Sequence, residues 1–131
     1  MAQALYGLGR DGFANAAINW TSDTINVALV GAGYTANMAT DNWYSSVVAN
    51  VIGVPVALAS KSSALGVCNA ANVTFAAIST GSTITQIVIY KSTGVNGTSL
   101  LIAREDVTST PTNGGTITLT WDSGANKVFS L

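Results

Sequence analysis

The chain has 131 residues, a length typical of one domain of about 100–200 residues, and 48% of them are hydrophobic. Only 8% are charged, against about 25% in an average globular protein, and the net charge is −1 with no histidine. Five Lys and Arg side chains are too few to neutralise a row of phosphates, which excludes DNA and RNA as direct partners.

Residues 1–15 are predicted to form an N-terminal arm or a loose helix. Leu5, Leu8 and Phe13 are spaced roughly as on one side of a helix, but three glycines interrupt them. Each glycine costs up to about 1 kcal/mol relative to alanine, so a helix here would need tertiary support. Residues 7–12, GLGRDG, also match the dinucleotide-binding pattern G-x-G-x-x-G, but six preceding residues are too few for the buried strand which that motif requires.

Alternating apolar residues separated by turn residues predict a series of strands. The continuous apolar run at 87–90 indicates a strand buried on both faces. Ile117, Leu119 and Trp121 alternate with threonines, which is typical of a strand with one face in the core and the other in solvent. The expected strands are 24–30, 54–59, 71–78, 84–91, 99–104, 116–121 and 127–131, and the last is expected to pair as a closing hairpin.

Strands of this length and spacing predict a single all-β domain over residues 1–131. The expected architecture is an antiparallel β-sandwich, jelly-roll-like, with the short N-terminal arm or helix added. A second short helical turn is expected at 41–47, with Asp41 as its cap. The most apolar stretch, 47–59, is interrupted by Asn50, Gly53 and Pro55 and falls short of the roughly 20 residues that a spanning helix needs, so no membrane partner is expected.

The sequence offers little for catalysis, and the chain is predicted not to be an enzyme. Acid–base chemistry needs paired carboxylates or a tunable histidine, and the acidic residues mostly lie beside predicted turns. The pair Glu105 and Asp106 is expected in a solvated loop after the 99–104 strand, without the spacing of a calcium loop. Cys68 lies in an apolar stretch with no cation beside it, which indicates a buried structural thiol. No cofactor and no metal are expected.

Apolar side chains in the N-terminal segment and in one loop are the candidates for binding a partner. Trp43 and Tyr44 lie near a predicted loop, where an exposed aromatic ring can anchor a partner or stack on a sugar. The alternative is that the loops pack their aromatic rings onto the sheet. The predicted partner-binding residues are Leu5, Tyr6, Leu8, Phe13, Trp43 and Tyr44.

Strand–turn–strand phrases recur over nearly the whole chain. They are WTSDTINVALV at 20–30, NVTF at 72–75, IVIYK at 87–91, TG at 93–94, NGG at 113–115 and TWDSGANKVF at 120–129. Together they resemble the auxiliary capsid proteins of tailed bacteriophages, the decoration or cement proteins. These phrases are structural, and the family has no active site to transfer.

The resemblance implies a jelly-roll-like sandwich that binds and stabilises the assembled capsid shell. Its implied partner is the major capsid protein of the same virion, and the protein itself is implied to be a homodimer or homotrimer on a symmetry axis. It would be made in the host cytoplasm and would reside on the capsid exterior. Low charge suits such close packing, since like copies repel weakly. Two alternatives stay open: a tail or baseplate component, and a carbohydrate-binding module for host adhesion.

Overall fold

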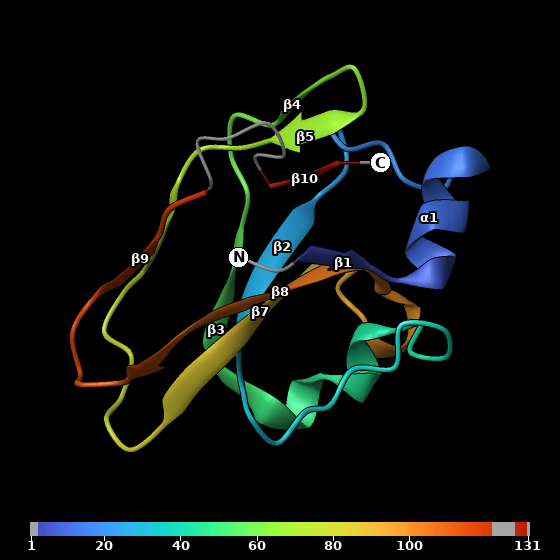
Figure 1. Cartoon of the computed structure of the whole chain (residues 1–131). Helices are drawn as coiled ribbons and strands as arrows, with labels where there is room; N and C mark the ends of the chain where they lie inside the picture. Colours follow the sequence, from blue (N-terminus) through green and yellow to red (C-terminus); the bar gives the residue numbers. More distant parts are fainter. Residues whose placement is uncertain (1–2, 122–127, 131) are drawn as a thin grey trace.

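A computed structural model describes residues 3–121 and 128–130, and most of its regular structure is β-strand (Figure 1). The strands are β1 (Gln3–Leu5), β2 (Ile25–Gly31), β3 (Val51–Ala57), β4 (Ser62–Ala64), β5 (Val67–Asn69), β6 (Val73–Phe75), β7 (Thr83–Lys91), β8 (Leu100–Pro111), β9 (Ile117–Leu119) and β10 (Phe129–Ser130). The helices are α1 (Gly7–Ala14) and three single 3-10 turns at Tyr44–Ser46, Val48–Asn50 and Asn96–Thr98. Every strand pair in the described residues is antiparallel, so the all-β prediction is confirmed.

The strands form three sheets. The main sheet has five strands in the order β1-β8-β7-β2-β3, and two smaller sheets have the orders β10-β5-β4 and β6-β9. The predicted closing hairpin is therefore wrong for the residues described, because β10 pairs with β5 and not with β9. Burial explains the choice: the Phe129 ring packs edge-on against Trp20, with centroids 5.1 Å apart, and both rings are buried. Residues 127 and 131 of that predicted strand lie outside the described residues.

The main sheet is buried on both faces. In β7, Ile87 and Ile89 face one hydrophobic cluster, while Val88 and Tyr90 face a second cluster. This confirms the prediction that the run at 87–90 is buried on both sides. The smaller sheets cover the first face, which we call the strand-covered face. Residues 32–50 cover the second, the loop-covered face.

The N-terminal segment is folded from Gln3 onward, so the prediction of an arm is wrong and the alternative of a helix is right. β1 pairs with β8, and the Tyr6 amide continues the pairing by donating to the Ile102 carbonyl at 2.9 Å. Helix α1 follows at once and packs on β8. The tertiary support that a glycine-rich helix requires is therefore supplied by an edge strand on one side of the helix and by β8 beneath it.

Two glycines let α1 approach β8 closely. A Cβ added at Gly9 would lie 2.6 Å from the Leu101 carbonyl oxygen, and one added at Gly12 would lie 2.9 Å from a methyl carbon of Leu100, the first residue of β8. Both distances are too short for a real side chain. Two glycines of the G-x-G-x-x-G match, Gly9 and Gly12, thus serve helix–strand packing.

Strand β8 is longer than expected and contains the acidic pair. It continues to Pro111, and Glu105 lies within it, in register with Gln3 of β1 and Ile87 of β7. Glu105 is fully buried and Asp106 is exposed. The prediction of a solvated loop is therefore wrong for Glu105, because main-chain pairing on both sides keeps the chain extended and strand alternation turns this side chain inward.

The segment at 41–47 contains one 3-10 turn, which begins after Trp43 and not after Asp41. The Asp41 carboxylate instead accepts a hydrogen bond from the Asn37 amide at 2.9 Å and closes the preceding turn. Among the described residues, no helix has the length and apolar character needed to cross a lipid bilayer.

Candidate functional site

The six residues predicted to bind a partner separate into buried and accessible groups. Tyr6 is 0% exposed and Tyr44 is 5% exposed, so both stabilise the core and neither can contact a partner in this fold. Tyr44 stacks on Tyr90 with ring centroids 4.0 Å apart. Trp43 is 39% exposed. The remaining three, Leu5, Leu8 and Phe13, are half-buried and pack against the edge of the strand-covered face.

Phe13 lies between two hollows in the surface. One hollow, of about 330 Å³, is lined by Leu5, Arg10, Phe13 and Ala14, which we call the Phe13 surface. The other, of about 340 Å³, runs from Phe13 towards Trp20 and the hairpin of β4 and β5. The structure therefore brings Leu5 and Phe13 together, with a single cation, Arg10, at the border of an apolar depression.

The tip of the β4–β5 hairpin presents an apolar residue that the sequence analysis missed. Leu65 is fully exposed and has a φ of 51°, and Gly66 after it has a φ of 81°. Tight hairpin turns with two positive φ angles normally use Asn, Asp or Gly, and a left-handed conformation costs other residues about 1–2 kcal/mol. Gly66 also lines the second hollow beside Phe13, so the hairpin tip borders the Phe13 surface. The sequence signal that could have indicated Leu65 is a leucine directly before a glycine, in the first position of a two-residue turn.

Trp43 is held in place by main-chain contacts to β8. The Tyr44 amide donates to the Ser99 carbonyl at 2.8 Å, and the Leu101 amide donates to the Asn42 carbonyl at 3.0 Å. Trp43 therefore lies beside Leu100 at the start of β8, the strand on which α1 also packs. The ring is an exposed aromatic on a fixed backbone, which is an arrangement suited to stacking or to anchoring a partner.

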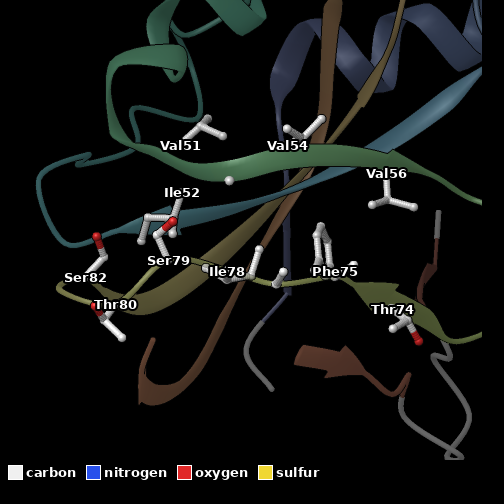
Figure 2. A pocket seen from close by; sticks show the side chains of 13 residues that line it. Val51, Ile52, Val54, Val56, Thr74, Phe75, Ile78, Ser79, Thr80 and Ser82 are labelled. Carbon is white, nitrogen blue, oxygen red and sulfur yellow. The ribbon is translucent and has the colours of Figure 1, made fainter. Parts of the chain in front are cut away.

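A larger hollow than the two beside Phe13 is a groove of about 640 Å³ between β3 and residues 74–80. In Figure 2, Ile52 and Val56 point from β3 towards Phe75 and Ile78, while Val54 points away. Ser79, Thr80 and Ser82 lie at one end of the groove and Thr74 at the other, and none of the side chains that line it is charged. The groove can hold apolar groups, but its lining contains nothing that can transfer a proton or act as a strong nucleophile. Sequence analysis did not predict it, because β3 and 74–80 meet only in the folded chain.

The buried hydroxyl and thiol groups are held in their neutral forms. The Tyr34 hydroxyl lies between two partners: it is 2.8 Å from the Tyr6 hydroxyl and donates to Asp41 Oδ2 at 2.8 Å. Burial raises the pKa of Tyr6 to about 12 and raises the pKa of Tyr34 even further. Burial also raises the pKa of Cys68 to about 11, which disfavours the reactive thiolate. These groups therefore act as hydrogen-bonding and packing groups of the core.

Asp23 closes a turn. The Asn19 amide donates to Asp23 Oδ2 at 2.7 Å, and Lys91 Nζ lies 3.1 Å from the same oxygen. The backbone hydrogen bond, aided by Lys91, lowers the pKa of this carboxyl group. Over residues 3–121 and 128–130, no three His, Cys, Asp or Glu side chains come together as a potential metal site.

Comparisons with known proteins found no relative of this chain. No family model matches the chain, and no curated protein or solved structure matches it either. The inference of function therefore depends on the surface features of the chain itself and on the resemblance of its strand–turn–strand phrases.

Proposed function

We propose that this chain is a decoration, or cement, protein of a tailed-bacteriophage capsid. It binds the major capsid protein on the outside of the assembled shell, works as a homodimer or homotrimer, and folds as a jelly-roll-like sandwich of the main sheet and the two smaller sheets. A protein that binds the assembled lattice better than free subunits adds its binding free energy to the stability of the shell. Modest contacts repeated over the lattice add up to a large effect.

One observation carries the proposal: the apolar Phe13 surface with the exposed, strained Leu65 beside it. An exposed leucine in a left-handed turn contributes nothing to the stability of the isolated chain. When it is buried against a partner, its apolar area contributes about 25 cal/mol per Å². The contact region is folded in the free protein, so little conformational entropy is lost on binding.

The test replaces Leu65 by glycine. Leu65→Gly removes the apolar side chain and relieves the strain, so the isolated domain should be as stable as the parent or more stable. Retention on purified shells that lack the protein should nevertheless fall at least about tenfold. Retention is measured by co-sedimentation over a range of protein concentrations, and stability by thermal unfolding.

The matched control is Val54→Ser. Val54 is 77% exposed, points to the side of β3 opposite Phe75 and Ile78, and lines neither of the two hollows beside Phe13. This variant should be retained as well as the parent. Full retention of Leu65→Gly would contradict the proposed contact. Deleting residues 3–14 is a poorer test, because it removes the edge strand and the helix that cover β8.

Trp43 favours a second candidate function, binding of carbohydrate. Its ring is 39% exposed on a fixed backbone, although the buried Tyr44 cannot join it in a stacking platform. A glycan array probed with the parent and with Trp43→Ala separates the two functions: glycan binding lost in Trp43→Ala supports the second. Copy number per virion separates the shell from the tail or baseplate, since hundreds of copies indicate the shell and about a dozen indicate the tail.

A further inference from the structure

The outer edge of β9 is an unprotected strand edge. β9 pairs with β6 on one side, and none of the described strands pairs with its other side. Such an edge is a template for another strand, and proteins that must avoid pairing use proline, charge or a bulge there. The edge strand β3 has such protection, with Pro55 and a bulge at Gly53, whose φ is 73°. Residues 116–121 have no proline and no charge, and the register of β9 with β6 is regular.

The hydrogen bonds around β9 show which main-chain groups point outward. The Ile78 amide donates to the Gly115 carbonyl at 3.1 Å, and the Trp121 amide donates to the Asn72 side chain at 3.3 Å. Odd-numbered residues of this segment therefore turn their main-chain groups towards the β6 side. By alternation along a strand, the N–H and C=O groups of Thr116, Thr118 and Thr120 point away from β6, and the three side chains are exposed.

The segment is complementary to a second copy of itself. In an antiparallel pair about a two-fold axis at Thr118, Thr118 faces its own copy and Thr116 faces Thr120. All cross-strand pairs on the outer face are then Thr–Thr, which is a favourable pair, and no like charges meet. On the inner face Ile117 lies opposite Leu119, so apolar residues meet apolar residues. The outward groups of the three threonines in each copy supply about six main-chain hydrogen bonds.

We propose that two copies of this chain pair through their β9 edges about a two-fold axis at Thr118. The pairing joins two β6–β9 sheets into one sheet of four strands, and a two-stranded ribbon on its own is only marginally stable. The interface is isologous, the commonest arrangement for a homodimer. The proposal goes beyond attachment to a shell and does not depend on it, because the dimer is measured on the isolated protein.

Cysteine cross-linking tests the register. A hydrogen-bonded antiparallel pair has Cα atoms about 5.5 Å apart, within the disulfide range of about 4.4–6.8 Å. Thr118→Cys should therefore form a covalent dimer under mild oxidation. Thr116→Cys alone should not, since its two copies would lie more than about 13 Å apart, but a mixture with Thr120→Cys should cross-link. The native Cys68 is 1% exposed, so it should contribute little background cross-linking.

Charge at the edge tests the interface without oxidation. Thr118→Lys places two lysines opposite each other across the axis, and the dissociation constant of the dimer should rise at least about tenfold. The matched control is Thr74→Lys, an exposed position on β6 that lies opposite Thr118 within the chain and away from the edge. Sedimentation velocity over a concentration series measures both variants, and circular dichroism verifies that each is folded.

Proline gives a second variant that separates pairing from folding. Proline is tolerated where the N–H group faces solvent, so Thr118→Pro should fold as a monomer, while Leu119→Pro, with its N–H group towards β6, should unfold more easily. A parent that stays monomeric at all concentrations would overturn the proposal. So would a dimer unaffected by Thr118→Lys, or Thr116→Cys cross-linking as fast as Thr118→Cys.

Discussion

The two faces of the main sheet are covered by different means. On the strand-covered face, the smaller sheets bring Val73, Phe75, Leu119 and Phe129 against the aliphatic side chains of β2 and β7. On the loop-covered face, residues 32–50 pack mainly through tyrosines and include the buried hydroxyl contacts of Tyr34. Regular strands cover the strand-covered face, and an irregular segment covers the loop-covered face.

The difference shows what an irregular cover requires. A segment without strand pairing leaves main-chain carbonyl groups that need partners when they are buried. Gln86 supplies them: its Nε2 donates to the carbonyls of Gly31 and Tyr34, and its Oε1 accepts from Arg104. The loop-covered face therefore depends on specific hydrogen bonds, while the strand-covered face depends on filled volume.

The largest effect is expected from Phe75→Ala on the strand-covered face. Phe75 is 1% exposed, and its removal leaves a cavity between β6 and the main sheet. The free energy of unfolding should fall by about 3–5 kcal/mol. Urea denaturation followed by tryptophan fluorescence measures the loss. A loss below about 1 kcal/mol would contradict the view that this face depends on packing.

A smaller loss is expected from Gly9→Ala, which presses α1 away from β8. The new Cβ would lie 2.6 Å from the Leu101 carbonyl, so helix and strand must separate at a cost of about 1–3 kcal/mol. The matched control is Gly7→Ala, whose Cβ would lie at an ordinary distance, 3.4 Å, from the Met38 carbonyl. That variant should be neutral or slightly stabilising, because alanine favours a helix. Equal losses of stability in Gly9→Ala and Gly7→Ala would refute close helix–strand packing. Thermal unfolding compares them.

On the loop-covered face, Tyr34→Phe should lower the free energy of unfolding by about 1–2 kcal/mol. The change keeps the ring and removes only the hydroxyl that contacts Tyr6 and Asp41. Hydrogen exchange should increase locally over residues 35–43, because Asp41 loses its link to the core. Thr35→Ala, at an exposed neighbour, should change stability by less than about 0.5 kcal/mol. A neutral Tyr34→Phe would mean that this face, too, depends on volume alone.

The smallest effect is expected at Asp23, a partly exposed residue paired with Lys91. Because its pKa is lowered in the folded chain, the ionised carboxylate adds stability above the pKa of the unfolded chain, and this is lost as the pH falls through the folded pKa. Asp23→Asn should be less stable than the parent near pH 7, by under about 1 kcal/mol, and the difference should shrink in acid. Melting temperatures at pH 7 and pH 3 measure it.

The control for this pH dependence is Asp11→Asn, at an exposed position on α1. The difference between this variant and the parent should be smaller at pH 7 than that of Asp23→Asn. If the difference in melting temperature between Asp23→Asn and the parent grew in acid, the hydrogen-bonding role of the carboxylate would be contradicted.

Prediction from the sequence succeeded where local pattern and final environment agree. The strand expected at 84–91 is β7 at Thr83–Lys91, and the strand expected at 24–30 is β2 at Ile25–Gly31. Both have a β-branched pattern that suits a strand between two others. The short strands β1, β4 and β5 were not predicted, since three residues show no periodicity.

The candidate site was predicted less well than the fold. Leu5 and Phe13 share a surface, but Tyr6 and Tyr44, beside other predicted residues in the sequence, are buried. A tyrosine has the same sequence signal whether its ring stacks on Tyr90 or faces solvent. Leu65 was missed because its importance comes from a turn conformation and not from its neighbours in the sequence.

The strand-rich character, the long apolar strand at the centre and the scarcity of charge can all be derived from the sequence, because they depend on composition and on a period of two residues. Three features became apparent only in the folded chain: Gly9 and Gly12 pack α1 against its neighbours, Glu105 lies inside a strand, and β10 pairs with β5. Each of these depends on which segments meet in space. Several segments far apart in the sequence could pair with the same strand edge or cover the same sheet face, and a local sequence pattern does not show which of them does.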